Sequence, residues 1–263
     1  MSVFKIIYLQ VKFLALQRLA YRGNNALNII STTVYTTLFI IFVVVIFRNT
    51  DMIGPYTKDA ILFLTLLGQI SFYFITATGY TSAIKLAESI NSGGLDYVFT
   101  KPVRHLPFVT FEGFDIITML FDGFPVIIVA SVINWSLLSF TIPSLAIGIL
   151  LFVLGLVMMY SIVVSLGCLA FWTGRSKNSI DVYWGLMHKT EQPIAALSTN
   201  LVLASLVVIP AAIPVSLAGS IMIGVLSPNL LYTLFGLGST IFWLAVLNII
   251  WSKGQRRYVS ASS

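Results

Sequence analysis

The sequence predicts an all-α membrane protein with six transmembrane helices, an N-terminal interfacial helix and a short re-entrant hairpin between spans five and six. Of its 263 residues, 58% are hydrophobic and only 9% are charged, whereas about 25% of a soluble domain is charged. The apolar tracts are long enough to cross the roughly 30 Å hydrocarbon layer as helices. Continuously apolar stretches such as 38–47 lack the alternating pattern of a membrane β-barrel. These observations exclude both a soluble protein and a barrel.

The elements are expected in one transmembrane domain covering residues 1–263. Residues 1–23 mix four basic side chains with apolar ones, which predicts an interfacial helix, although a simple basic leader has the same composition. The apolar tracts then give six predicted spans, at about 26–47, 60–81, 115–138, 145–172, 194–212 and 230–251.

The apolar tract before the last span needs a separate interpretation. It is too long for one span and too short for two, and Pro210 and Pro214 interrupt it. Because proline removes a backbone donor and clashes with the preceding turn, we predict a helix to about 212 followed by a re-entrant piece at 214–228. Backbone without regular hydrogen bonds at this depth must be buried in protein, so this piece should pack against other spans.

Lysine and arginine positions predict the orientation in the membrane. Six crossings put thirteen of the fifteen basic residues on one side and only Arg48 and Lys58 on the other. By the positive-inside rule, both termini are expected in the cytoplasm. The basic residues stand at the ends of apolar tracts and form no long patch, so the net charge of +6 predicts no nucleic-acid partner.

Sequence patterns of catalysis are not found. The chain has no phosphate-binding P-loop, no His-Glu-x-x-His and no Gly-x-Ser-x-Gly. Its two histidines fall in separate loops, and Cys168 is its one cysteine. We therefore expect no enzyme activity, no bound cofactor and no metal site in this chain.

The loop after the second predicted span is the first informative polar segment. Lys85 and Glu88 are three residues apart on a helix that should continue this span into the cytoplasm until Ser92-Gly93-Gly94 breaks it. A short amphipathic piece, 95–100, follows and should end at Lys101-Pro102. A helix–turn–helix at the base of two spans is suited to receive force from a cytoplasmic partner, and an ordinary interfacial loop fits the composition equally well.

The second cytoplasmic loop, 173–193, has a similar character. It contains Arg175, Lys177 and Asp181, followed by the aromatic pair Tyr183-Trp184. Amphipathic rings beside basic side chains are typical of the lipid headgroup zone. A second docking element is the alternative interpretation.

Three acidic residues near the third predicted span form a further candidate site. Glu112, Asp115 and Asp122 are spaced to lie on one face of a helix, and charges are costly in hydrocarbon. They are expected to form ion pairs near the interface or to line a polar pathway. Deeper in the membrane, Gln69 is a candidate for a hydrogen bond between helices or for a cavity wall, and Gly148 for close helix packing.

The layout as a whole resembles the permease subunits of type-2 ATP-binding-cassette (ABC) exporters. The shared features are a basic leader, six spans with both ends inside, a structured second-to-third loop and a re-entrant hairpin. The segment Ile90-Asn-Ser-Gly-Gly-Leu-Asp-Tyr-Val-Phe-Thr-Lys-Pro102 looks like the Gly-x-Leu-Asp…Lys-Pro pattern of one bacterial branch of these permeases, and 257–262 resembles its ending.

This resemblance implies a transport subunit of the bacterial inner membrane without its own motor. Such permeases pair as homodimers or heterodimers, contact membrane lipid and dock separate P-loop ATPase subunits, which bind the ATP and Mg. The second loop would lie near a further contact through Arg175, Lys177 and Asp181. The residues that would lie in or beside the main coupling loop are Lys85, Glu88, Asp96, Tyr97, Lys101 and Pro102.

Two other functional classes remain open at this stage. An ion-coupled secondary transporter would need coupling residues near the membrane midplane, and the acidic residues of the third span are the only candidates. A membrane assembly subunit would need no transport pathway.

Overall fold

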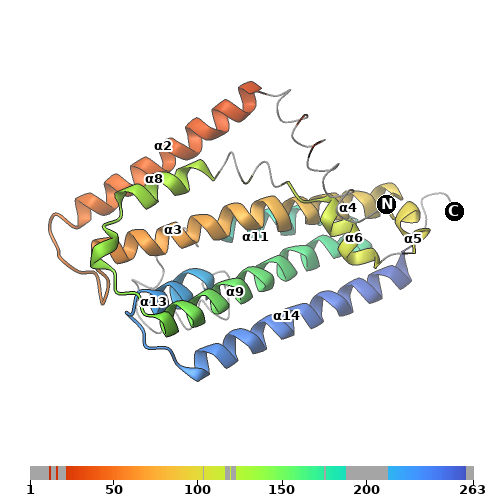
Figure 1. Ribbon diagram of the computed structural model, residues 1–263. Helices are drawn as coiled ribbons and strands as arrows, with labels where there is room; N and C mark the ends of the chain where they lie inside the picture. The colour runs from red at the N-terminus through yellow and green to blue at the C-terminus, as the bar shows by residue number, and fades with distance from the viewer. Residues whose placement is uncertain are drawn as a thin grey trace.

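The computed structural model describes residues 12, 16, 22–102, 104–115, 119, 123–174, 176–187 and 213–258 (Figure 1). Within these residues the regular structure is helical, and β pairing is confined to an isolated bridge between Ile53 and Tyr56. Four helices are long and apolar enough to cross a membrane. They are α2 (Arg22–Ile46), α3 (Lys58–Ile75) with its continuation to Ser92, α9 (Ile142–Cys168) with α10 (Ala170–Thr173), and α14 (Leu230–Arg257).

These four helices coincide with the predicted spans at 26–47, 60–81, 145–172 and 230–251. The predicted fifth span, 194–212, lies outside the described residues, as does nearly all of the predicted interfacial helix 1–23. Of the third, 115–138, the structure describes α8 (Phe124–Val132) and a 3₁₀ turn, Trp135–Leu137. The all-helical membrane architecture is therefore observed, while the count of six spans stays a prediction.

Polar residues cap the N-termini of three long helices, and these N-termini lie at the same end of the bundle. The side chains of Thr57, Thr141 and Asn229 each accept a hydrogen bond from a backbone N–H of the first turn of α3, α9 and α14, respectively. Such N-caps satisfy donors that the helix itself leaves unpaired. Figure 1 shows that α3, α9 and α14 run in one direction and α2 in the other, which places the predicted cytoplasmic loops together at the far end.

One long helix forms the centre of the fold. The helix α3 continues through a π-helical turn, η1 (Thr76–Tyr80), into α4 (Thr81–Ser92). It packs against α2 and α8 on one side and α9 on another. Gln69 donates from Nε2 to Thr36 Oγ1 of α2 at 3.0 Å, which confirms the predicted hydrogen bond between helices.

The segment before the last span packs against α3 and α9, as expected for the predicted piece at 214–228. It consists of η5 (Ile213–Ala218), α13 (Gly219–Met222) and a turn at Gly224 with φ of 72°. Its side chains 216–223 are buried, and Tyr56 Oη lies 2.9 Å from Ser220 Oγ. Gly148 of α9 faces α13, where a Cβ would collide with the Met222 side chain, so close packing at Gly148 is confirmed. The re-entrant course relative to the membrane stays a prediction.

Candidate functional site

The predicted helix–turn–helix after the second span is present. The helix α4 ends at Ser92, and Gly93 adopts the left-handed conformation with φ of 78°. Glycine reaches this conformation without steric cost, so it commonly ends helices. A five-residue helix, α5 (Leu95–Phe99), follows. The predicted helical structure of 82–100 is therefore confirmed, while the choice between a docking element and an ordinary interfacial loop stays open.

The outer surface of this motif carries most of the predicted coupling residues. Lys85 and Glu88 are exposed on α4, and Pro102 is exposed after α5. Tyr97 is 63% exposed. The Lys101 ammonium lies over the Tyr97 ring, 3.8 Å from its centroid, and this cation–π contact fixes the end of α5.

The inner surface of α5 is anchored in the protein core. Leu95 and Val98 are buried in a cluster with Leu86 of α4 and Trp251 of α14. The Phe99 ring packs against Tyr258, with centroids 5.5 Å apart. Displacement of α5 must therefore move the ends of both α4 and α14.

Tyr258, which follows α14, also meets the beginning of α5. Its hydroxyl is shielded from solvent and makes no hydrogen bond of standard geometry. Burial raises the pKa of Tyr258, and the nearby Asp96 carboxylate raises it further. The half-buried Asp96 thus faces the end of the last span, a contact that sequence spacing could not predict.

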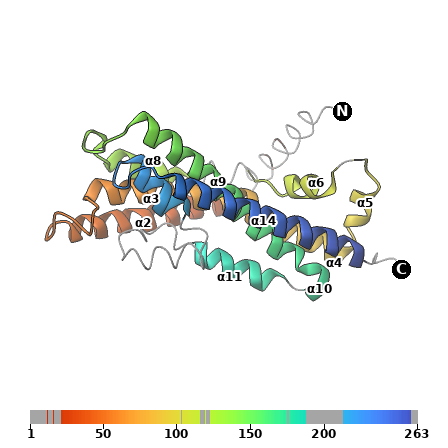
Figure 2. The same ribbon diagram turned by 90° about the horizontal axis from the view of Figure 1, so that it is seen from below.

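The second loop forms a helix, α11 (Lys177–Met187), that packs along the central helix (Figure 2). Lys177 is exposed, Asp181 is half-buried, and Arg175 lies outside the described residues. The Tyr80 hydroxyl donates to Asp181 Oδ1 at 2.9 Å. Asp181 therefore binds the central helix.

In the aromatic pair of this loop Tyr183 is buried and Trp184 is half-buried against the central helix, and their placement among lipid headgroups stays a prediction. Tyr183 is buried, and the Trp184 indole N–H donates to Thr76 Oγ1 at 3.4 Å. Burial strongly raises the pKa of Tyr183, whose hydroxyl has no hydrogen-bond partner. The rings are amphipathic, and η1 offers them aromatic and polar partners that the sequence pattern does not show.

The two predicted docking loops share a polar groove. It has a volume of about 350 Å³ and lies between α4 and the start of α11, with Glu88 and Lys177 among its lining residues. Asn91 Nδ2 of α4 donates to the Gly174 carbonyl at 2.9 Å and so joins its two walls. The loops thus form one composite surface at this end of the bundle.

The three acidic residues do not lie on one continuous helix. The helix α6 (His105–Glu112) ends at Glu112, and residues 113–115 are not helical. At the break, Gly113 lies directly against Ser82 of α4, which leaves no room for a side chain at 113. Asp115 donates its backbone N–H to the Ala77 carbonyl at 2.8 Å, and Asp122 lies outside the described residues. The shared face predicted for Glu112 and Asp115 is therefore wrong.

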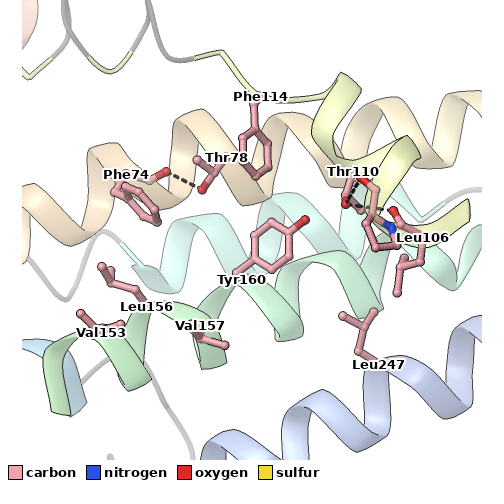
Figure 3. A pocket seen from close by; sticks show the side chains of 11 residues that line it. Phe74, Thr78, Leu106, Thr110, Phe114, Val153, Leu156, Val157, Tyr160 and Leu247 are labelled. Atoms are coloured by element: carbon pink, nitrogen blue, oxygen red, sulfur yellow. Dashed lines mark hydrogen bonds between the residues drawn. The ribbon is translucent and has the colours of Figure 1, made fainter. Parts of the chain in front are cut away.

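A second cavity, of about 530 Å³, lies among the central helix, α6, α9 and α14 (Figure 3). Its volume is within the range of roughly 300–1,000 Å³ typical of small-molecule sites. The hydroxyls of Thr78 and Thr110 bond to carbonyls of their own helices, so they offer little to a ligand. The Tyr160 ring is part of its lining and packs edge-on against the Phe114 ring, with centroids 6.1 Å apart (Figure 3). The cavity is suited to an apolar molecule, and no local sequence pattern pointed to it.

Among the described residues, no group of three or more His, Cys, Asp or Glu side chains could hold a metal ion.

The fold and the predominance of apolar helices define a multi-pass α-helical membrane protein. Residues 33–262 match the family model described as "ABC-2 family transporter protein". The chain therefore belongs to the ABC-2 transporter family, and it is a permease component of an ABC transporter. No curated protein and no solved structure matches the chain significantly. Family membership makes the chain a membrane transport component, itself not catalytic, that partners with an ATP-binding subunit.

Proposed function

We propose that this chain forms the translocation pathway of an ATP-driven exporter and couples to a separate ATPase through α4, α5 and α11. The observation that carries this proposal is the composite surface of the two cytoplasmic loops. Both loops expose charged residues there, with Lys85 and Glu88 on one and Lys177 on the other. Both are also anchored to the central helix or its continuation, so movement of a bound ATPase would reach the spans.

The wider assembly follows from the same proposal. The permease pairs with a second permease, identical or different, in contact with membrane lipid in the bacterial inner membrane. Both termini are cytoplasmic, because the loops at the α5 end carry most of the basic residues. ATP and Mg bind to the partner ATPase.

Export is the direction favoured by two observations. The loops at the opposite end of the bundle are short, with residues 47–57 linking α2 to α3, and they form no external capture domain among the described residues. The apolar cavity beside Tyr160 supports an apolar or amphipathic cargo.

The test is purification of the tagged chain from its native membrane in mild detergent. We expect a P-loop ATPase to co-purify and to hydrolyse ATP in the complex, together with a second permease. Purification of an intact chain without an ATPase would contradict the proposal and favour an ion-coupled transporter.

Charge exchanges locate the docking surface. Asp96→Lys combined with Lys101→Glu should lower the co-purified ATPase at least about tenfold, because like charges facing each other across an interface cost several kcal/mol. Lys85→Glu with Glu88→Lys changes two exposed side chains and tests the same surface with little effect on folding. The matched control, Arg48→Glu with Asp51→Lys, alters exposed charges at the opposite end. Equal ATPase recovery from all three variants would remove this surface from the mechanism.

A further inference from the structure

The central helix contains an irregular turn between its buried span and its cytoplasmic end. In η1 the Thr81 N–H donates to the Thr76 carbonyl, five residues back, in place of the Ala77 carbonyl four residues back. Single π-helical turns inside α-helices are rare and occur frequently at functional sites. This turn is therefore the place where the long helix can most readily change its hydrogen bonding.

The helix α11 contacts both ends of this turn. At one end, the Tyr80 hydroxyl donates to Asp181 Oδ1 at 2.9 Å. At the other end, Trp184 Nε1 donates to Thr76 Oγ1 at 3.4 Å. Asp181 and Trp184 are three residues apart and so share one face of α11. The Trp184 ring also packs on the Tyr80 ring, with centroids 5.7 Å apart.

The segment formed by α6 and residues 113–115 also holds the π turn, through hydrogen bonds of its own backbone. The Ala77 carbonyl, which does not bond to the Thr81 N–H, accepts the Asp115 N–H at 2.8 Å and the Thr81 hydroxyl at 2.8 Å. The Ser82 hydroxyl, one residue further along, donates to the Thr110 carbonyl of α6 at 2.6 Å. The π turn is therefore held by α11 and by the segment around α6.

The turn also borders the apolar cavity. Phe74 and Thr78 line the cavity, while Thr76 and Tyr80 contact α11. Residues two positions apart lie on nearly opposite faces of a helix with about 3.6 residues per turn. Figure 3 shows the Phe74 and Thr78 side chains on the cavity side, close to the Tyr160 ring. The turn thus separates α11 from the cavity.

We propose that this π turn is the joint through which α11 transmits movement of the ATPase to the cavity, with Tyr80 and Asp181 as positioning residues. The inference rests on the proposed function, because it requires an ATPase that contacts the composite surface. When α11 shifts, the Tyr80–Asp181 hydrogen bond pulls on the turn, which changes its hydrogen bonding and moves Phe74 and Thr78. A regular α-helix at this position would transmit the movement only as a rigid rod.

Hydrogen–deuterium exchange of the complex with its ATPase in lipid nanodiscs tests this inference. The nucleotide-free complex is compared with the complex trapped by Mg-ATP and vanadate. Amides of residues 76–84 should change their exchange rate about fivefold, which corresponds to one hydrogen bond gained or lost. ATP hydrolysis is measured in parallel. An unchanged rate at 76–84 in a complex that hydrolyses ATP would overturn the inference and leave the proposed function standing.

Three variants separate positioning from simple stabilisation. Tyr80→Phe and Asp181→Ala each remove the hydrogen bond and should abolish the exchange response at 76–84. The ATPase should stay bound and active in Tyr80→Phe, because Tyr80 is not part of the composite surface. Asp181→Asn keeps an acceptor oxygen and should restore the response. Tyr232→Phe removes the same hydroxyl from α14 and is the matched control. A full response in Tyr80→Phe would overturn the inference, and loss of the ATPase from the wild-type complex would contradict the proposed function as well.

Discussion

The central helix α3 and the helices α2 and α14 can all cross a membrane, yet they have opposite surroundings. In the most apolar stretch of the central helix 83% of the residues are buried, whereas the corresponding share is 17% in both α2 and α14. The central helix is nevertheless less hydropathic than either of them. Hydropathy therefore identifies helices that can span a membrane and does not identify the one at the centre.

Lipid provides the physical reason for this difference. Hydrocarbon chains solvate leucine as well as a protein core does, so apolar side chains such as Leu38 on α2 lose little by staying exposed. Small and polar residues determine which helices approach closely. In α3, Ser71 and Thr65 bond to carbonyls of their own helix, and Gln69 reaches α2. Burial of these polar side chains marks the central helix, because α2 also contains polar side chains but leaves some of them, such as Ser31 and Thr37, exposed.

The largest effect is expected where two backbones touch. A Cβ at Gly167 of α9 would lie 2.8 Å from the Ala83 carbonyl oxygen and 3.0 Å from the Ala83 Cα of α4. Gly167→Leu should therefore destabilise the chain by about 3 kcal/mol or more, because backbone cannot move aside as a flexible side chain can. The midpoint of thermal unfolding in detergent measures this loss.

Gly238→Leu is the matched control on the exposed face of α14. A Cβ there meets nothing within 4 Å, and replacing a helical glycine favours the helix by up to about 1 kcal/mol. Its unfolding midpoint should stay level or rise. Equal losses from both substitutions would contradict the contrast between central and outer helices.

The break between α4 and α5 and the four described spans could be predicted, because the residues that determine them are neighbours in the sequence. Gly93 and Gly94 follow α4, and Pro102 follows α5, so the break between these helices depends on residues at the break itself. The four described spans were predictable because a tract of about twenty apolar residues is needed to cross the bilayer. Family membership was predictable from the same loop and the layout of the spans.

The remaining features depend on contacts between distant residues. Residue 113 must be glycine because Ser82 lies against it, and the acidic spacing gives no sign of the break in the helix at 113–115. Tyr183 and Trp184 suit a membrane surface and a protein interior equally by composition. Tyr183 is buried and Trp184 half-buried because α11 lies beside η1, and local propensity does not specify that position. Tertiary contacts therefore decided the parts of the site that local sequence did not predict.

An intermediate effect is expected for the one side-chain hydrogen bond between α2 and α3 that the described residues show. Hydrogen bonds between membrane helices average about 0.6 kcal/mol and reach about 1.7 kcal/mol. In a double-mutant cycle of Thr36→Val and Gln69→Leu, we expect a coupling energy of this size. Both side chains are buried and the bond is 3.0 Å long, so the upper half of the range applies. If the losses of unfolding free energy in the two single variants simply add up in the double variant, this hydrogen bond contributes nothing and apolar packing alone holds α2 against α3.

The smallest effect at neutral pH concerns Tyr183, which joins α11 to the central region. Its hydroxyl is buried without a hydrogen-bond partner, so Tyr183→Phe should leave stability unchanged or raise it by about 1 kcal/mol. A larger difference should appear in alkali. Burial raises the Tyr183 pKa above the ordinary value of 10.0 in the folded chain. Above pH 10 the unfolded chain therefore loses a proton that the folded chain retains, and wild-type stability falls as pH rises.

The measurement compares unfolding midpoints of the wild type and Tyr183→Phe between pH 8 and pH 11, on either side of the ordinary tyrosine pKa. The gap between them should be constant below about pH 10 and widen above it in favour of the variant, because phenylalanine has no proton to lose. Tyr97→Phe, at a side chain that is 63% exposed, serves as the matched control. A constant gap for Tyr183→Phe would mean that α11 opens to water at high pH before the bundle unfolds. The helix would then be a separately folding layer on the central helix, and its hydrogen bonds to η1 would break without loss of the spans.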